Sequence, residues 1–232
     1  MPNSEHIVSS FDRDLEGIQA QIMRMGGLVE EAIAKATEAL DTRDVDLARL
    51  VRSGDTAIDK IDEQVNDEAA RVIAQRQPTA SDLRTVLTVF RISTNLERIG
   101  DYAKNIAKRT ETIIEQPPVD GTGASLRRMA RQVELMLKDA LDAYIQRDAD
   151  LAADVRTRDL DVDQMYSALF REYLTFMMED PRNITTCMHL HFMAKNIERM
   201  GDHVTSIAEQ VIYLATGELP DEDRPKHDQT PH

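Results

Sequence analysis

The sequence predicts an all-α protein made of two tandem, similar three-helix bundles, and three observations lead to this prediction. Between residues 11 and 217, apolar residues recur almost throughout with the period of an α-helix. Only 4% of the 232 residues are aromatic, with no Trp and 9 Gly, which suits helices packed through aliphatic side chains better than a β-sandwich. Finally, segment 95–101 (NLERIGD) returns as 196–202 (NIERMGD), which indicates two copies of one unit.

The first unit is predicted to contain helices over 7–41, 45–76 and 82–115. Their apolar stripes are Ile18, Ile22, Met25, Val29, Ile33, Ala36 and Leu40; then Leu47, Val51, Ile58, Ile61, Val65 and Val72; then Val86, Val89, Ile92, Leu96, Ile99, Ala103 and Ile106. In the first helix, Gly26 and Gly27 indicate a bend or a close neighbour. Pro78 ends the second helix, and Thr79 or Ser81 is expected to cap the third.

The second unit repeats this plan with helices over 126–146, 149–178 and 184–216. Arg147-Asp148 marks its first turn, just as Arg43-Asp44 marks the first turn of the first unit. The segment 180–183 (DPRN) is the counterpart of the Pro78 turn, and Asn183 is expected to cap the last helix.

The domain boundaries follow from composition. The stretch 116–125 (QPPVDGTGAS) is the clearest linker in the chain, because it is rich in Gly, Pro and small polar residues. We therefore expect a first bundle over 1–115, a linker over 116–125, a second bundle over 126–217 and a disordered tail over 218–232.

Charge and cysteine content exclude several classes of function. The 42 acidic residues outnumber the 28 basic ones, and the formal charge of -14 repels nucleic acids and anionic lipids while attracting multivalent cations. The single cysteine, Cys187, permits no disulfide within the chain and no thiolate zinc site, and we expect it to be buried. The first residues do not resemble a signal peptide, and no segment is long and apolar enough to span a bilayer, so we expect a cytoplasmic protein.

Four acidic pairs have the i, i+4 spacing that places both members on one face of a helix. They are Asp55 and Asp59, Glu97 and Asp101, Asp159 and Asp163, and Glu198 and Asp202. In an antiparallel helical hairpin, residues equidistant from the turn lie level with each other. Asp55 and Asp59 lie as far before Pro78 as Asp101 and Glu97 lie after it. In the second unit, Asp159 and Asp163 are level with Asp202 and Glu198 when distances are counted from the point between Asp180 and Pro181. Each hairpin is therefore expected to bring four carboxylates together on the flank of its bundle.

Cations between these carboxylates would remove a repulsion of about 0.2–0.5 kcal/mol per pair in an isolated helix. Oxygen ligands suit Mg²⁺, Mn²⁺, Ca²⁺ or iron better than zinc or copper. We expect all eight acids to be ligands of divalent or iron cations, with Mg, Mn, Fe and Zn as candidates. The alternative is that the acids hold no metal and only keep the flanks soluble.

Other residues of the repeated motif have simpler interpretations. A glycine in mid-helix costs about 1 kcal/mol relative to Ala, so Gly100 and Gly201 indicate the close approach of a neighbouring helix or ligand. Asn95 and Asn196 are candidates for hydrogen bonds across the bundle. His191 has Phe90 as its counterpart, and we interpret it as a packing residue.

Taken together, these motifs resemble the PhoU family of regulators of bacterial phosphate uptake. The resemblance spans about residues 11–216 and rests on Asn-x-Glu-Arg-x-Gly-Asp in both units, the Asp-x-x-x-Asp elements at 55–59 and 159–163, and Asp180-Pro181-Arg182. It implies two similar three-helix bundles whose carboxylate motifs bind metal ions, including multinuclear iron clusters in some members. It also implies a regulator and not an enzyme.

By the same resemblance, we expect a negative regulator of the phosphate-starvation response that also modulates phosphate uptake. Its expected partners are the ATPase subunit of the phosphate ABC transporter and a sensor histidine kinase, between which it acts as an adaptor. A homodimer is expected, with no nucleic acid ligand and no insertion into the membrane; recruitment to the inner membrane face by the partners is left open. The alternative is a carboxylate-bridged, metal-dependent hydrolase that uses bound water as the nucleophile.

Overall fold

The computed structural model describes residues 3–119 and 121–220, and within them the fold is entirely helical. The helices are α1 (Asn3–Thr42), α2 (Val45–Arg76), α3 (Ala80–Ile113), α4 (Thr122–Gln146), α5 (Ala149–Glu179) and α6 (Ile184–Thr216), with a short 3₁₀ turn, η1 (Pro181–Asn183), before α6. The predicted all-α class and its six helices are therefore confirmed. The predicted tail is non-helical over 218–220, and its remainder, 221–232, lies outside the described residues.

The same device makes the first turn of both units. Arg43 and Arg147 adopt left-handed backbone conformations, with φ of 57° and 53°, and end their helices. The next residue, Asp44 or Asp148, then caps the following helix by accepting hydrogen bonds from two backbone N–H groups of its first turn. The equivalence of the two turns, predicted from the sequence, therefore extends to their hydrogen bonds.

The structure corrects three details at helix ends. Thr79 and Asn183 occupy the N-cap positions of α3 and α6, but neither side chain caps; Asn183 instead donates to the carbonyl of Phe176 at 3.4 Å. Helix α4 begins at Thr122, inside the predicted linker, because Gly121 takes a left-handed conformation (φ 82°) that turns the chain into the helix. The Thr122 hydroxyl supports this turn by donating to the carbonyl of Val119 at 2.7 Å.

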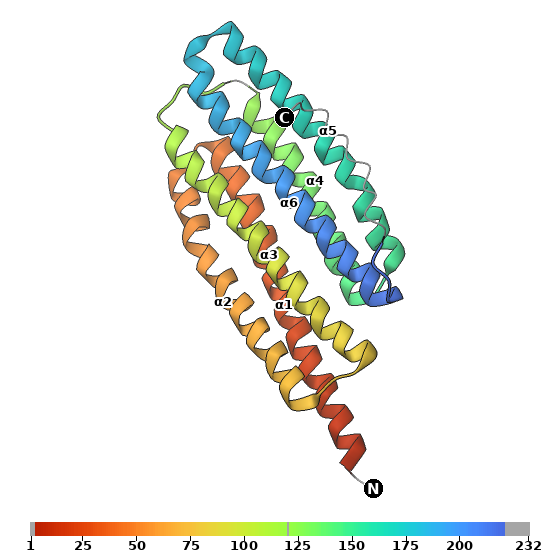
Figure 1. Ribbon diagram of the computed structural model, residues 1–232. Helices are drawn as coiled ribbons and strands as arrows, with labels where there is room; N and C mark the ends of the chain where they lie inside the picture. The colour runs from red at the N-terminus through yellow and green to blue at the C-terminus, as the bar shows by residue number, and fades with distance from the viewer. Residues whose placement is uncertain (1–2, 120, 221–232) are drawn as a thin grey trace.

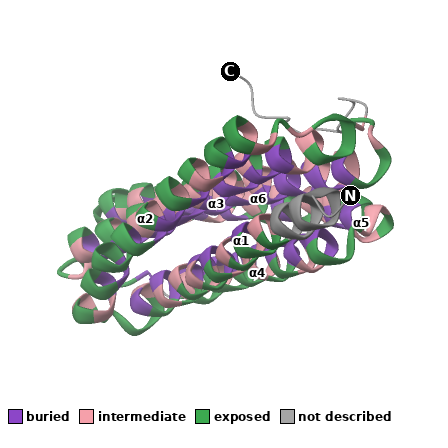
Figure 2. Cartoon of the chain, turned by 90° about the horizontal axis from the view of Figure 1, so that it is seen from below, coloured by how far each residue is buried: buried purple, intermediate pink, exposed green. Residues whose placement is uncertain are grey.

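The two units lie side by side along their length (Figure 1). Helix α1 packs against α4 and α3 against α6, and each unit also packs its own three helices together. The buried faces of α3 and α6 turn toward the interior, whereas α2 presents an exposed face outward (Figure 2). Buried apolar residues of both units belong to one contiguous core, so the repeats meet through apolar surface.

Close packing between the units depends on Gly26. A Cβ atom at this position would overlap with Cδ1 of Leu141 in α4, whereas the neighbouring Gly27 has no atom within 4 Å of such a Cβ. Of the two interpretations that the sequence allowed for this glycine pair, the close neighbour is therefore the correct one, and Gly26 is the residue that permits it.

Two expectations about composition can be compared with these helices. None of them, over the residues described, combines the length and apolarity that crossing a membrane requires. Cys187 is buried in α6 as a free thiol, as expected.

Candidate metal centre in each repeat

The first carboxylate cluster lies between α2 and α3. Burial raises the pKa of Asp59, and the neighbouring charges of Asp55 and Asp101 raise it further. Burial likewise raises the pKa of Glu97; Arg98 opposes this effect, and the charges of Asp101, Asp62 and Asp59 add to it. The four acids predicted for the first unit are thus close enough to act on one another's ionisation.

Gly100 explains how Asp55 reaches this position. A Cβ atom at Gly100 would lie 3.0 Å from Cδ1 of Ile58 and 3.8 Å from Oδ1 of Asp55, so α2 approaches the backbone of α3 at this glycine. Asp55 is only 4% exposed, whereas Asp59, Glu97 and Asp101 are half-buried. The cluster therefore lies on the flank of the bundle, as expected, but one member points into the interior.

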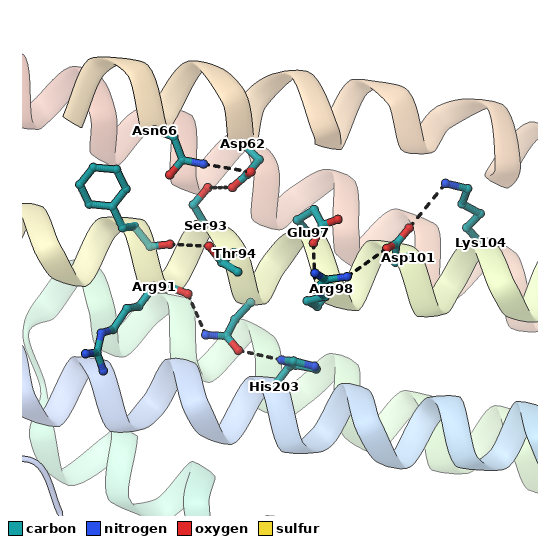
Figure 3. A network of polar contacts seen from close by, with 12 residues as sticks. Asp62, Asn66, Arg91, Ser93, Thr94, Glu97, Arg98, Asp101, Lys104 and His203 are labelled. Atoms are coloured by element: carbon teal, nitrogen blue, oxygen red, sulfur yellow. Dashed lines mark hydrogen bonds and ion pairs between the residues drawn. The ribbon is translucent and has the colours of Figure 1, made fainter. Parts of the chain in front are cut away.

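Two basic side chains of α3 offset part of the negative charge of the first cluster (Figure 3). The Lys104 ammonium forms an ion pair with the buried Asp55 and lies 3.5 Å from Oδ1 of Asp101. Arg98 lies 3.4 Å from Glu97 and 3.8 Å from Asp101. The hydrogen bond to Asp55 raises the pKa of Lys104, which keeps the amine charged.

Asp62 extends the first cluster and was not predicted. The hydroxyl of Ser93 donates to one carboxylate oxygen of Asp62, and the side-chain amide of Asn66 donates to the other at 3.0 Å (Figure 3). The sequence did contain a signal for it, because Asp62 follows Asp59 by three residues and so lies on the same face of α2.

The second cluster lies between α5 and α6 at the equivalent place. A Cβ atom at Gly201 would lie 2.9 Å from Oδ1 of Asp159, so this glycine accommodates the carboxylate just as Gly100 accommodates Asp55. Burial raises the pKa of Glu198; Lys195 opposes the increase, and the charges of Asp202 and Asp163 add to it. The four acids predicted for the second unit therefore also come together.

Glu198 is bonded through only one of its oxygens. Lys195 donates to Oε1 at 2.7 Å, whereas Oε2 is buried and has no hydrogen-bond partner among the described residues. A buried carboxylate oxygen without a donor is unfavourable, and a bound cation would satisfy it.

Aromatic residues take the place of the Asp62 network in the second unit. Tyr166 and Phe170 are the counterparts of Asp62 and Asn66, and they hold the His191 ring at centroid distances of 5.8 and 5.2 Å. His191 is therefore a packing residue, as predicted. Both clusters thus have acids of the same type at the four equivalent positions, but the residues around these acids differ.

The repeated motifs also contact each other across the α3–α6 seam. His203 donates through Nδ1 to Oδ1 of Asn95 at 2.7 Å (Figure 3). The centroid of its ring lies 5.6 Å from that of the Tyr102 ring. The sequence suggested a hydrogen bond for Asn95 but assigned no role to His203. His203 directly follows Asp202 at the end of the repeated motif, but nothing in that position identified its partner.

The donor set is compatible with a hard cation, although it is not assembled as a cage. Among the residues that the structure describes, no group of three or more His, Cys, Asp or Glu side chains is arranged to hold a metal ion. The carboxylates instead neighbour Lys104, Arg98 and Lys195. All predicted ligands are oxygen atoms, and Oε2 of Glu198 is buried with no hydrogen-bond partner among the described residues. The donors are of the type that a divalent cation prefers, but in this structure Lys104 and Lys195 are paired with Asp55 and Glu198.

Comparison with known sequences supports the division into two units. The chain matches the model of the PhoU domain twice, over residues 22–110 and 126–211. It is 46% identical over 225 residues to the phosphate-specific transport system accessory protein PhoU homolog of Rhizobium meliloti (strain 1021), covering 97% of this chain and 95% of the relative. The homolog of the same name from Caulobacter vibrioides (strain NA1000 / CB15N) is 45% identical, with coverage of 97% and 98%.

Solved structures are similar to the fold described above. The crystal structure of PhoU from Pseudomonas aeruginosa superposes with a TM-score of 0.86 at 39% identity, covering 90% of this chain and 100% of that one. The phosphate transport system regulatory protein PhoU from Streptococcus pneumoniae gives a TM-score of 0.84 at 31% identity, with coverage of 91% and 99%.

Proposed function

The chain belongs to the PhoU family, and from this premise we propose that it acts in phosphate transport as a metal-binding regulator and not as an enzyme. The relatives' names, phosphate-specific transport system accessory protein, support the role in phosphate transport. In the finer proposal, the protein represses the phosphate-starvation response and links the ATPase subunit of the phosphate ABC transporter to a sensor histidine kinase. It does so in the cytoplasm as a homodimer, and its partners recruit it to the inner membrane face.

The observation that carries the metal-binding part is the occurrence of one four-carboxylate cluster in each repeat. Asp55, Asp59, Glu97 and Asp101 would hold a cation in the first unit, and Asp159, Asp163, Glu198 and Asp202 would hold one in the second. Burial raises the pKa values of Asp59, Glu97 and Glu198, and the charges of neighbouring carboxylates raise them further. A carboxylate whose ionisation is made unfavourable by burial and by like charges gains stability from a cation.

A bound cation would supply positive charge that joins α2 to α3 and α5 to α6. The clusters lie on the flanks of the bundles, so binding would change the charge of a surface that is open to a partner protein. This arrangement suits a regulator, which requires a surface whose charge changes with its state.

Elemental analysis after gentle purification tests the metal site. We expect divalent or iron cations in the wild-type protein and their loss when Glu97, Asp101, Glu198 and Asp202 are replaced by Gln or Asn. The control carries Asp67→Asn and Asp161→Asn, which remove exposed acids from the same hairpins. Helicity should be retained in both proteins. Equal metal content in the two would overturn the assignment of these ligands.

Deletion in the source organism tests the regulatory role. Loss of the protein should raise expression of phosphate-starvation genes in phosphate-rich medium, and the wild-type gene should restore repression. Unchanged expression would contradict a negative regulator.

The alternative is a metal-dependent hydrolase, which the carboxylate chemistry alone would allow. Turnover of a phosphate ester that disappears in the four-ligand variant, but persists in the Asp67→Asn, Asp161→Asn control, would favour it. We expect no turnover in either protein.

A further inference from the structure

Each carboxylate cluster contains an ammonium group supplied by its own hairpin. In the first unit, Lys104 pairs with Asp55 and lies near Asp101; in the second, Lys195 pairs with Glu198. Lys195 also lies 5.1 Å from the centroid of the Tyr166 ring, so its charge rests over an aromatic face. One positive charge is thus already present in each cluster of four acids.

The two lysines do not derive from the same position of the repeat. Lys104 follows Asp101 by three residues, and its counterpart in the second unit is Thr205; Lys195 precedes Glu198 by three residues, and its counterpart is Thr94. Duplication of the motif therefore does not explain their presence. Two different positions, at opposite ends of the motif, deliver the same charge to equivalent clusters.

An ammonium group and a metal cation compete for the same oxygen atoms. The lysine must leave before a metal can use the oxygen that it occupies, and a nearby ammonium also repels the metal. Both lysines can move aside, because their side chains are 41% and 38% exposed and end long, flexible stems.

We propose that Lys104 and Lys195 are intramolecular competitors of the metal, which hold the carboxylates together in the metal-free protein and set the affinity of each cluster. This inference rests on the proposed metal function. The lysines are positioning residues, and metal binding exchanges an internal cation for an external one.

Titration of the metal-free, full-length protein with Mn²⁺ tests the proposal. Calorimetry on Lys104→Gln and Lys195→Gln should give dissociation constants about tenfold lower than wild type, since one unit charge is removed a few ångströms from the metal. The matched control is Lys108→Gln, an exposed lysine one turn beyond Lys104 in the same helix, which should bind as wild type does. Lys104→Arg retains the charge and should not bind more tightly than wild type.

A second readout separates competition from misfolding. Without metal, Lys104→Gln should melt at a lower temperature than wild type, because the buried Asp55 loses its partner, and Mn²⁺ should remove most of this difference. If Lys104→Gln fails to fold, Lys195→Gln and Lys104→Arg decide the question by affinity alone. Unchanged or weaker Mn²⁺ binding in the Gln variants, with binding in wild type, overturns this inference and leaves the proposed function intact. Absence of Mn²⁺ binding in every protein overturns both.

Discussion

Gly26 and Gly27 are neighbours in α1, yet they contribute differently to stability. We expect Gly27→Ala to raise the free energy of unfolding by up to about 1 kcal/mol, since the added methyl meets no atom and Ala favours the helix. Gly26→Ala has the same gain in helix propensity, but its methyl group displaces Leu141, and this overlap should lower the free energy of unfolding by about 1–3 kcal/mol. Urea denaturation of the two variants measures the difference, and each serves as the control of the other. Equal effects would mean that α1 and α4 do not approach at Gly26.

His191 gives the protein a dependence of stability on pH. Burial among aromatic rings lowers the pKa of His191, with a further contribution from the charge of Lys195. The unfolded chain therefore takes up a proton first as the pH falls through about 6.5, and stability is lost below that pH. His191→Phe, which copies Phe90 of the first unit, should reduce the loss between pH 7.5 and 5.5. It also removes the buried Nδ1, which has no partner among the described residues.

Thermal melting at several pH values measures this effect. At pH 7.5 the His191→Phe variant should be at least as stable as wild type, and the two curves should diverge on acidification. Parallel loss of stability in both proteins would show that the decline comes from other groups.

At the scale of the helix, the repeated Asp caps set where α2 and α5 begin. Asp44→Ala and Asp148→Ala should each lower the free energy of unfolding by about 1 kcal/mol, because each removes hydrogen bonds to two backbone N–H groups. Asn in the same positions retains an accepting oxygen and should restore most of the loss. Denaturation of each variant measures it. Asp46→Ala is the control, since this exposed acid caps no N–H group and contributes only to the helix dipole and to a surface ion pair with Arg49; an equal loss there would contradict the capping role.

The sequence predicted the helices better than their ends. Apolar periodicity located all six, because a stripe of helical spacing has few other ways of being buried. Caps were harder to predict: Thr79 and Asn183 are suitable residue types, but their side chains make no capping bond. Whether a polar side chain turns to its own helix depends on competing acceptors outside that helix, such as the carbonyl of Phe176 at the end of α5.

The carboxylate clusters show the same limit at the level of the site. Heights measured from the turns predicted which acids meet, and the repeat provided a check, since both hairpins gave the same answer. The height of a residue along a hairpin does not determine where its side chain points. The burial of Asp55 and the ion pairs of Lys104 and Lys195 were therefore seen only in the folded structure. His203 was missed because its partner, Asn95, lies in the other repeat.

At the scale of the whole molecule, the shared core predicts that both repeats unfold together. Leu141 of α4 is 2% exposed and packs against α1, so Leu141→Ala should lower the free energy of unfolding by about 2–4 kcal/mol. Because the core is contiguous, hydrogen exchange should accelerate in α3 as well as in α6, and calorimetry should show one transition. Leu135→Ala, an exposed position on α4, is the control. Two separate transitions, with only α4–α6 affected, would instead show that the duplicated units fold independently.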